Sequence, residues 1–250
     1  MPDTSSTRDM SDNFQYQRRR AIYTYISGLV SGDVLEISDS YPEGMDLLTP
    51  HVRSLTIVSR HACRIDPTRW EHVEFHRVAQ PPFIQASGSF DFIISYHVLV
   101  HSRDDFEMIR ELHRMLRPGG RLILISPNRQ MSLTRNPWYV REYLGDELYN
   151  LLRYRFREVE PMGVFGGPKA MEYYEKNKQT VQYLLQRDVL KFHRWLPRLL
   201  FRIPYNLYNR MIRRQLLIAH RTLTCSLTPE DYYVAPAAEQ CFDWIYIATH

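Results

Sequence analysis

Two histidines follow the apolar run Phe90–Ser95, at positions where a side chain could move a proton. His97 and His101 lie four residues apart just after this run. Imidazole titrates near neutral pH, so a histidine close to the end of a strand can serve as a general base. We assign this role to His101, with a hydrogen-bonded structural role as the alternative. We expect Tyr96 to line a pocket at the same strand end, where ligands bind in open α/β sheets; the alternative is ordinary core packing.

These histidines do not form a metal-binding motif. No third ligand has zinc spacing, and the glutamate of a His-Glu-x-x-His helix is absent. The three cysteines, Cys63, Cys225 and Cys241, are scattered, and we interpret them as packing residues in a reducing compartment. The sequence therefore predicts neither a metal site nor a disulfide framework.

The segment from Arg135 to Tyr143 is dense in groups that can orient a substrate. We predict that it contributes to substrate binding; the alternative is loop packing with Trp138 as the anchor. Further along the chain, Tyr173 and Tyr174 either close over the same cleft or pack within a helical cap. The candidate substrate residues are Arg135, Trp138, Arg141, Tyr143 and Tyr173.

The candidate site residues are positioned by short apolar runs that alternate with helical patterns. A helical pattern covers Asp12–Val30, and another covers Asp104–Leu116, which ends at the turn Arg117-Pro118-Gly119-Gly120. The apolar runs lie at 34–37, 54–58, 73–75, 90–95 and 121–126. This alternation indicates an α/β fold with a parallel sheet covered by helices on both faces.

The later part of the chain predicts an insert between two strands of one sheet. A short helix around 142–152 and a strand over 156–165 precede the break at Gly166-Gly167-Pro168. Residues 171–217 are helical in composition but are interrupted by Pro197 and Pro204, and a final strand follows at 242–248. We therefore predict a core over residues 1–167, a helical insert over 168–224, and a segment over 225–250 that completes the sheet.

The block from Phe90 to Asn128 carries a family resemblance. It joins an apolar strand, a helix containing Glu111-Leu112-His113-Arg114-Met115-Leu116, a Pro-Gly-Gly turn and a second strand. This block resembles the class I S-adenosylmethionine (SAM) dependent methyltransferases of the type 11-like group, in which it forms the fourth strand, its helix and the fifth strand. Weaker similarity extends over nearly the whole chain. The resemblance implies a doubly wound Rossmann-like sheet, mostly parallel with a terminal antiparallel strand, plus a helical insert.

The resemblance also implies a SAM site on the first turn and on the ends of the following strands. In such sites a glycine-rich turn lets the backbone approach the ligand, and an acid after the second strand binds the ribose. A second acid, after the third strand, would lie beside the adenine. The positions that the resemblance implies for cofactor binding are Glu36, Ser38, Ser40, Gly44, Ser59, Val78 and Tyr96.

Most of these positions carry the wrong residue for SAM. Side chains replace the expected glycines at Ser38, Ser40 and Pro42, and the two expected acids fall at Ser59 and Val78. Added side chains restrict the backbone and occupy space that the ligand needs. Each unmet hydrogen bond costs about 1–3 kcal/mol. We therefore expect SAM binding, if retained, to be weakened by orders of magnitude.

Positive charge is concentrated late in the chain. The net charge is only +4, but basic residues from Arg187 to Arg221 face a single acid, Asp188, and are interleaved with aromatic side chains. We interpret this segment as a cap that shows its arginines to water, with a protein partner or peripheral membrane contact as alternatives. We do not expect a nucleic-acid partner, because no recognition motif accompanies the charge.

The chain has no apolar stretch close to the roughly 18 residues that a membrane span needs. Residues 1–20 are polar and lack the apolar middle part of a secretory signal. We expect a cytoplasmic protein.

Two classes of function follow from the resemblance. We favour a non-catalytic homologue, or pseudoenzyme, kept as a binding or partner subunit, for example beside an active methyltransferase relative. The alternative is an active O- or N-directed methyltransferase that acts on a small-molecule, lipid or glycan-precursor acceptor. Catalysis would then come chiefly from proximity and orientation, with His101 as the base and the Arg135–Tyr143 loop binding the acceptor.

Overall fold

The structure is a computed structural model that describes residues 10–38, 44–60, 70–78, 80–134, 136–186 and 210–250, with the backbone alone for 184–186. These residues divide into two compact units. The larger comprises Ile22–Ser132, Tyr139–Phe165 and Val234–His250, and the smaller comprises Met1–Ala21, Leu133–Trp138 and Gly166–Tyr233. The predicted insert over 168–224 falls in the smaller unit, which also takes in earlier segments; its boundaries stay a prediction.

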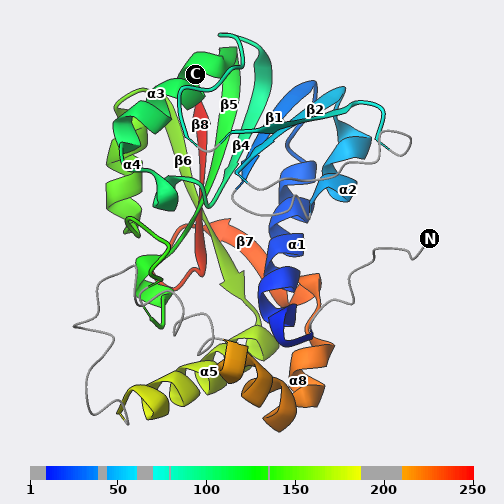
Figure 1. Cartoon of the computed structure of the whole chain (residues 1–250), viewed down its shortest axis with the longest axis vertical. Coiled ribbons are helices and arrows are strands. Elements are labelled where there is room, and N and C mark those ends of the chain that lie inside the picture. Colours follow the sequence, from blue (N-terminus) through cyan, green and yellow to red (C-terminus); the bar gives the residue numbers. More distant parts are fainter. Residues whose placement is uncertain (1–9, 39–43, 61–69, 79, 135, 187–209) are drawn as a thin grey trace. The chain divides into compact units, whose positions relative to one another are not determined.

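The strands form one mixed sheet in the order β3-β2-β1-β4-β5-β8-β6-β7 (Figure 1). Parallel pairing joins β3 to β2, β2 to β1, β1 to β4 and β4 to β5, while β8 runs antiparallel between β5 and β6. This arrangement confirms the predicted doubly wound sheet with a terminal antiparallel strand. The strands are β1 (Asp33–Ser38), β2 (Ser54–Ser59), β3 (Val73–Arg77), β4 (Phe90–Tyr96), β5 (Leu116–Pro127), β6 (Glu158–Gly166), β7 (Tyr232–Pro236) and β8 (Asp243–Thr249).

One predicted turn is part of a strand. We expected Arg117-Pro118-Gly119-Gly120 to separate a helix from a strand beginning at Arg121, but β5 begins at Leu116. Leu116 pairs with Phe90, and the register shifts before Phe92 pairs with Arg121. A bulge of this kind absorbs extra residues without ending the ladder, and Gly119 supplies the positive φ of 78° that few other residues adopt.

The helices follow the predicted apolar periodicity closely. Asp104 caps α3 by accepting a hydrogen bond from the Glu107 amide at 2.9 Å. The α-helices are α1 (Asn13–Ser27), α2 (Met45–Leu48), α3 (Asp105–Met115), α4 (Gly145–Arg153), α5 (Pro168–Gln186) and α8 (Arg221–Ser226), and residues 210–219 are also helical. Short 3-10 turns are η1 (Met10–Asp12), η2 (Thr49–His51), η3 (Leu99–His101), η4 (Arg129–Met131) and η5 (Pro229–Asp231).

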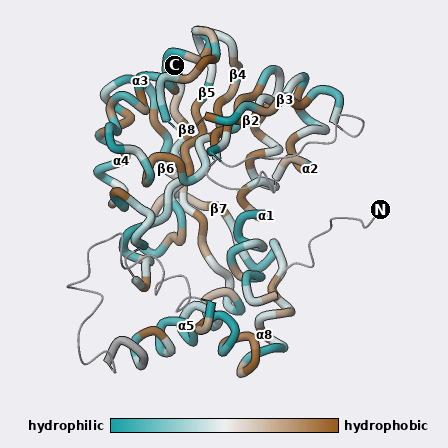
Figure 2. The backbone as a smooth tube through the Cα atoms, in the orientation of Figure 1, coloured by the Kyte–Doolittle hydropathy of each residue, from teal (hydrophilic) through white to brown (hydrophobic). Residues whose placement is uncertain are grey.

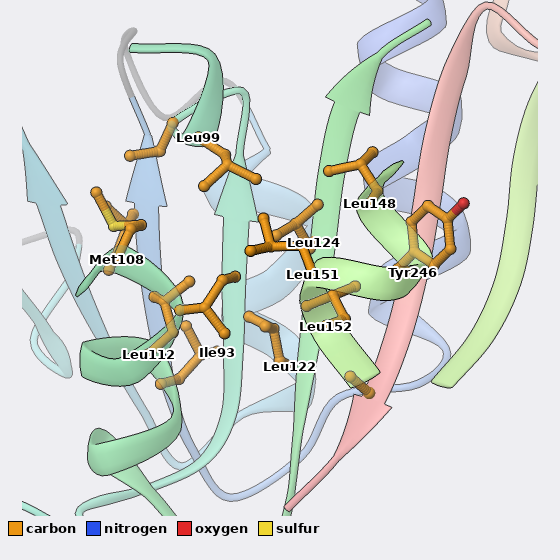
Figure 3. Packing of buried hydrophobic residues seen from close by; sticks show 14 of the residues in the cluster. Ile93, Leu99, Met108, Leu112, Leu122, Leu124, Leu148, Leu151, Leu152 and Tyr246 are labelled. Atoms are coloured by element: carbon orange, nitrogen blue, oxygen red, sulfur yellow. The ribbon is translucent and has the colours of Figure 1, made fainter. Parts of the chain in front are cut away.

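The main core of the larger unit lies between the sheet and the helices α3 and α4. Met108 and Leu112 of α3 and Leu148, Leu151 and Leu152 of α4 point toward Ile93, Leu122 and Leu124 of the sheet (Figure 3). Hydrophobic colour follows the central strands, and the helices alternate between brown and teal faces (Figure 2). Because successive strand residues face opposite sides, Leu35 and Ile37 join this core while Val34 and Glu36 point to the other face.

Ion pairs hold the amino ends of β1 and β4 together. Asp33 accepts hydrogen bonds from Arg53 and from Arg117, and Arg117 also reaches Asp91 at 2.7 Å. The Asp91 carboxylate further accepts from the Asp33 amide at 2.8 Å. This cluster marks the edge of the sheet opposite to the one where ligands bind in such folds.

The smaller unit is held by contacts from the start of α1. The buried Asn13 side chain donates to the carbonyls of Thr224 and Leu227, at 2.7 and 3.1 Å. Phe14 stacks on Tyr173 with ring centroids 4.7 Å apart, and its carbonyl accepts from the Tyr232 hydroxyl at 2.8 Å. In the part of the chain that the structure describes, no helix is both long and apolar enough to cross a membrane.

Candidate functional site

The carboxyl edge of the parallel strands gathers several of the predicted cofactor residues. Ser38 at the end of β1 is in register with Ser59 of β2 on one side and with Tyr96 of β4 on the other. Val78 directly follows β3, and its amide donates to the Ser59 carbonyl at 3.1 Å. The sheet order therefore brings together residues that are up to 58 positions apart (from 38 to 96).

A small pocket opens at this edge. It encloses about 260 Å³ of space, including the part open to solvent, and its walls are Ile37, Ser38, Val58, Arg60, Val78, Phe83 and Val98. Ser38 and Val78 belong to the predicted cofactor set, whereas the sequence analysis did not single out Arg60, Phe83 and Val98. Most of these lining residues are aliphatic or aromatic, and Arg60 is the one among them that carries a positive charge.

Residues of α3 hold the part of the pocket wall that Phe83 forms. Buried Glu111 accepts from the Phe83 amide at 3.2 Å, and Arg114 donates to the carbonyls of Phe83 and Gln85 at 3.2 and 2.9 Å. Arg114 also pairs with Glu111 at 2.9 Å, and this hydrogen bond lowers the pKa of the Glu111 carboxyl. The ion pair therefore ties the loop around Phe83 to the helix and gives the pocket a fixed side.

Tyr23 of α1 occupies the opposite side of β1. Its hydroxyl donates to the buried Glu36 carboxylate at 2.5 Å, and its ring stacks against Tyr96 with centroids 5.7 Å apart. The ring also packs on Gly44 so closely that a Cβ at this position would overlap with it. Glu36, Gly44 and Tyr96 thus share one neighbour, an aromatic side chain that is 1% exposed.

A histidine–aspartate pair lies further along the same edge. His97 Nε2 is 3.0 Å from Oδ1 of Asp243, which is fully buried at the start of β8. The His97 ring stacks on Tyr96 at 4.3 Å, and its backbone has a φ of 54°, a conformation that costs a non-glycine residue about 1–3 kcal/mol. The sequence analysis singled out His97 but not Asp243, because no local spacing links residues 146 positions apart.

His101, the predicted general base, lies in η3 and has different neighbours. Its ring meets Tyr139 edge-on at 5.2 Å, and its carbonyl accepts a hydrogen bond from Gln80 at 3.4 Å. The structure thus pairs His97 with a carboxylate at hydrogen-bond distance. The role of His101 as a base stays a prediction.

Residues 58–124 match the family model of the methyltransferase domain. A relative from Mycolicibacterium smegmatis, named "Probable S-adenosylmethionine-dependent methyltransferase", is 28% identical over 64% of this chain and 66% of its own length. A similarly named protein of Mycobacterium tuberculosis is 28% identical over 64% of this chain and 62% of its own length. The chain is therefore similar in sequence to SAM-dependent methyltransferases. The match spans less than two thirds of the length of these relatives.

Solved structures share the fold of this chain. A SAM-dependent methyltransferase from Thermotoga maritima superposes with a TM-score of 0.57 at 14% identity, over 95% of this chain and 91% of the other. The [4+2]-cyclase SpnF superposes with a TM-score of 0.54 at 15% identity, over 93% of this chain and 80% of its own.

The predicted acceptor residues fall in different surroundings. Arg141 pairs with Asp105 and Glu147 at 3.3 and 3.1 Å and lies over the Tyr143 ring. Tyr143 is fully buried, which raises the pKa of its phenol, and its hydroxyl reaches the Leu99 carbonyl at 3.4 Å. These contacts give both residues a structural role in the larger unit.

The other predicted acceptor residues belong to the smaller unit or are not described. Trp138 is 43% exposed, and Tyr173 is 3% exposed against Phe14. Ser40, Pro42, Arg135 and residues 187–209 of the basic segment lie outside the described residues. In the described part of that segment, Arg213 pairs with Asp12.

The described residues offer few groups that could hold a metal or the SAM ribose. No group of three or more metal-binding side chains occurs within the described ranges. For SAM, the described pocket walls include no carboxylate to accept from ribose hydroxyls, and Glu36 is engaged by Tyr23.

Proposed function

We propose that this protein is a non-catalytic member of the methyltransferase family that serves as a binding or partner subunit. The observation that carries the proposal is Arg60, which lines the pocket directly after β2, next to Ser59. In dinucleotide-binding sheets this strand end carries the acid that binds the ribose. A guanidinium here has donors and no acceptor.

The charge of SAM adds to the mismatch. Its sulfonium centre and ammonium group are positive, and they outweigh its single carboxylate. Two like charges about 4 Å apart repel by roughly 1 kcal/mol in water and about 4 kcal/mol near a protein surface. The loss of the acid at Ser59 together with the adjacent Arg60 therefore changes both the hydrogen-bond pattern and the sign of the local field.

The retained residues Glu36 and Gly44 also have an explanation that needs no cofactor. Both contact Tyr23, which donates to Glu36 and packs on Gly44. The packing of α1 on β1 therefore explains why these two residues are present as well as ligand binding does. A solved protein with this fold is named a [4+2]-cyclase, and a fold by itself does not fix the reaction.

Isothermal titration with SAM and with S-adenosylhomocysteine tests the proposal. We expect no detectable heat, and no thermal shift at millimolar ligand. Binding at micromolar strength, about −8 kcal/mol, would overturn the proposal. The M. smegmatis relative, measured in the same way, serves as the matched comparison.

As partner we propose an active methyltransferase relative. Co-expression with candidate relatives from the same genome, followed by sizing with light scattering, tests this part. We expect a stable complex that transfers methyl groups faster than the relative alone. A chain that stays monomeric with every relative would contradict the partner role.

The His97–Asp243 pair favours a second candidate, an active methyltransferase. A buried carboxylate that holds one imidazole nitrogen orients the ring for proton transfer. In that case His97→Gln and Asp243→Asn would each lower acceptor-dependent release of S-adenosylhomocysteine, while His101→Gln would leave it within about twofold. Equal rates in all variants would rule out this assignment of the base.

A further inference from the structure

The helical residues 210–219, which precede α8 in the smaller unit, have one buried face and one exposed face (Figure 1). Ile212 and Leu216, four positions apart, are each 2% exposed. Met211 and Ile218 are exposed and lie seven positions apart, so they share a helix face two turns from each other. This second face points away from the side chains that pack inside the unit.

The exposed face carries large aliphatic side chains. Ile218 is 83% exposed and Met211 is 42% exposed. Among the large hydrophobic residues that the structure describes, Ile218 has the highest exposed fraction. Transfer of such a side chain from water to an apolar medium is favourable.

The same face is strongly basic. Residues 210–229 contain no aspartate or glutamate, and Arg213 is the arginine that pairs with Asp12. Three other arginines are exposed and have no ion pair within the described part of the chain, namely Arg210, Arg214 and Arg221. The first two precede Ile218 at intervals of four residues, which places them on its helix face.

This combination fits an anionic lipid surface better than other partners. Helices that lie on membranes present large apolar side chains together with arginines, and acidic headgroups attract the positive charge. A second copy of this face would bring like charges together, which opposes association. The phosphates of a nucleic acid would pair with the arginines but would not bury the Ile218 side chain.

We infer that the exposed face of residues 210–219 docks on a bilayer that contains anionic lipids. Met211 and Ile218 insert at the level of the headgroups, and the three exposed arginines pair with lipid phosphates. The inference goes beyond the proposed function, because it uses none of the residues at the carboxyl edge of the sheet.

Co-sedimentation of the full chain with lipid vesicles tests the inference. The probes are vesicles of phosphatidylcholine alone and vesicles in which about one third of the lipid is phosphatidylglycerol. We expect at least about tenfold tighter binding to the anionic vesicles at low salt, and a smaller difference as salt screens the charges.

A pair of isoleucine variants tests the insertion. Ile218→Ser should weaken binding to the anionic vesicles by about fivefold or more, because the aliphatic group that enters the bilayer is lost. Ile84→Ser is the matched control, since Ile84 is 69% exposed but belongs to the larger unit, and it should leave binding unchanged.

A pair of arginine variants tests the charge. Arg214→Gln should weaken binding by about fivefold and reduce its dependence on salt. Arg157→Gln removes the same charge from an exposed position in the larger unit and should leave binding unchanged. Thermal unfolding of all four variants verifies that they fold.

Several outcomes would overturn the inference. Equal binding to the two kinds of vesicle, binding to neither, or equal losses within each pair of variants would each do so. Poly-glutamate and duplex DNA are tested in the same buffer. If either binds through Arg214 while the vesicles do not, the surface belongs to an acidic protein or to nucleic acid. A dimer that Ile218→Ser abolishes, without vesicle binding, would assign the surface to a second copy.

Discussion

At the scale of single residues, Tyr23 explains features that the sequence alone assigned to a cofactor. Glu36 and Gly44 are the residues of the first turn that still match the methyltransferase pattern. The structure places the Tyr23 hydroxyl on the Glu36 carboxylate and the Tyr23 ring on Gly44. A buried carboxylate needs hydrogen-bond donors, so this tyrosine has a direct stabilising role.

Tyr23→Phe should therefore destabilise the protein. The change removes one donor from a fully buried carboxylate, and we expect the free energy of unfolding to fall by about 1–3 kcal/mol. Urea unfolding followed by circular dichroism measures this difference.

Tyr25→Phe is the matched control, because Tyr25 lies on the same helix but is only partly buried. It should change the free energy of unfolding by less than about 0.5 kcal/mol. Equal effects of the two substitutions would contradict the role assigned to the Tyr23 hydroxyl.

At the scale of elements, the amino and carboxyl edges of the sheet serve different purposes. The amino edge ties β1 to β4 through the cluster of Asp33, Asp91, Arg53 and Arg117. The carboxyl edge holds the pocket and the His97–Asp243 pair. Substitutions at the amino edge therefore test stability, and substitutions at the carboxyl edge test binding.

The lowered pKa of Asp33 predicts how the stability of the protein changes at low pH. Hydrogen bonds from Arg53, then Arg117, lower the pKa of Asp33 below its ordinary value. Such a group contributes stability above its unfolded pKa, about 3.9, and that contribution is lost as the pH falls through that value toward the lower folded pKa. Its partner Arg53 is largely exposed, so each ion pair contributes only about 0–1 kcal/mol.

Asp33→Asn should consequently lower the melting temperature at pH 7 and flatten its decline toward pH 3. Scanning calorimetry across this range measures both changes. Glu158→Gln, an exposed carboxyl on β6, is the control and should leave the profile unchanged. A wild-type decline retained in full by Asp33→Asn would refute the prediction.

The packing of α3 against the sheet predicts a second effect on stability. Leu112 is fully buried between α3 and the strands (Figure 3). Leu112→Ala should lower the free energy of unfolding by about 2–5 kcal/mol, because it removes buried apolar atoms and leaves a cavity.

Phe106, on the same helix, is 59% exposed and contacts Tyr154 edge-on at 5.4 Å. Phe106→Ala should cost no more than about 1.5 kcal/mol, the upper range for an aromatic pair. Denaturant unfolding of both variants shows whether the loss in free energy of unfolding depends on the burial of the side chain rather than on its size.

At the scale of the whole molecule, the chain forms two compact units that draw on distant segments. The smaller unit joins the first turn of α1 to α8 through the Asn13 side chain, across more than 200 residues of sequence. The larger unit contains the pocket, the His97–Asp243 pair and most of the sheet. Loss of Asn13 should thus affect one unit before the other.

Asn13→Ala leaves the buried carbonyls of Thr224 and Leu227 without this donor, at a cost of about 1–3 kcal/mol. Hydrogen exchange should accelerate over 210–233 and remain unchanged in β1, β4 and β5. Gln17→Ala, which removes the partner of the Asn13 side-chain oxygen, should have a smaller effect. Uniform acceleration across both units would show that they unfold together.

The sequence by itself determined the class of fold and the order of its main elements. Apolar runs at 34–37, 54–58, 90–95 and 121–126 became β1, β2, β4 and part of β5, because strand and helix periodicity is a local property. The block from Phe90 to Asn128 carries the resemblance to methyltransferases, and the residues at Ser38, Ser59 and Val78 differ from those that this resemblance predicts for a cofactor site.

Tertiary structure alone decided which side chains meet. The sheet order places the start of β8 beside the end of β5, which brings Asp243 to His97, and α1 brings Tyr23 to Glu36. It also buries Tyr143 and engages Arg141 in ion pairs. The physical reason is that contacts between distant residues depend on strand order and register, which no local spacing of residue types records.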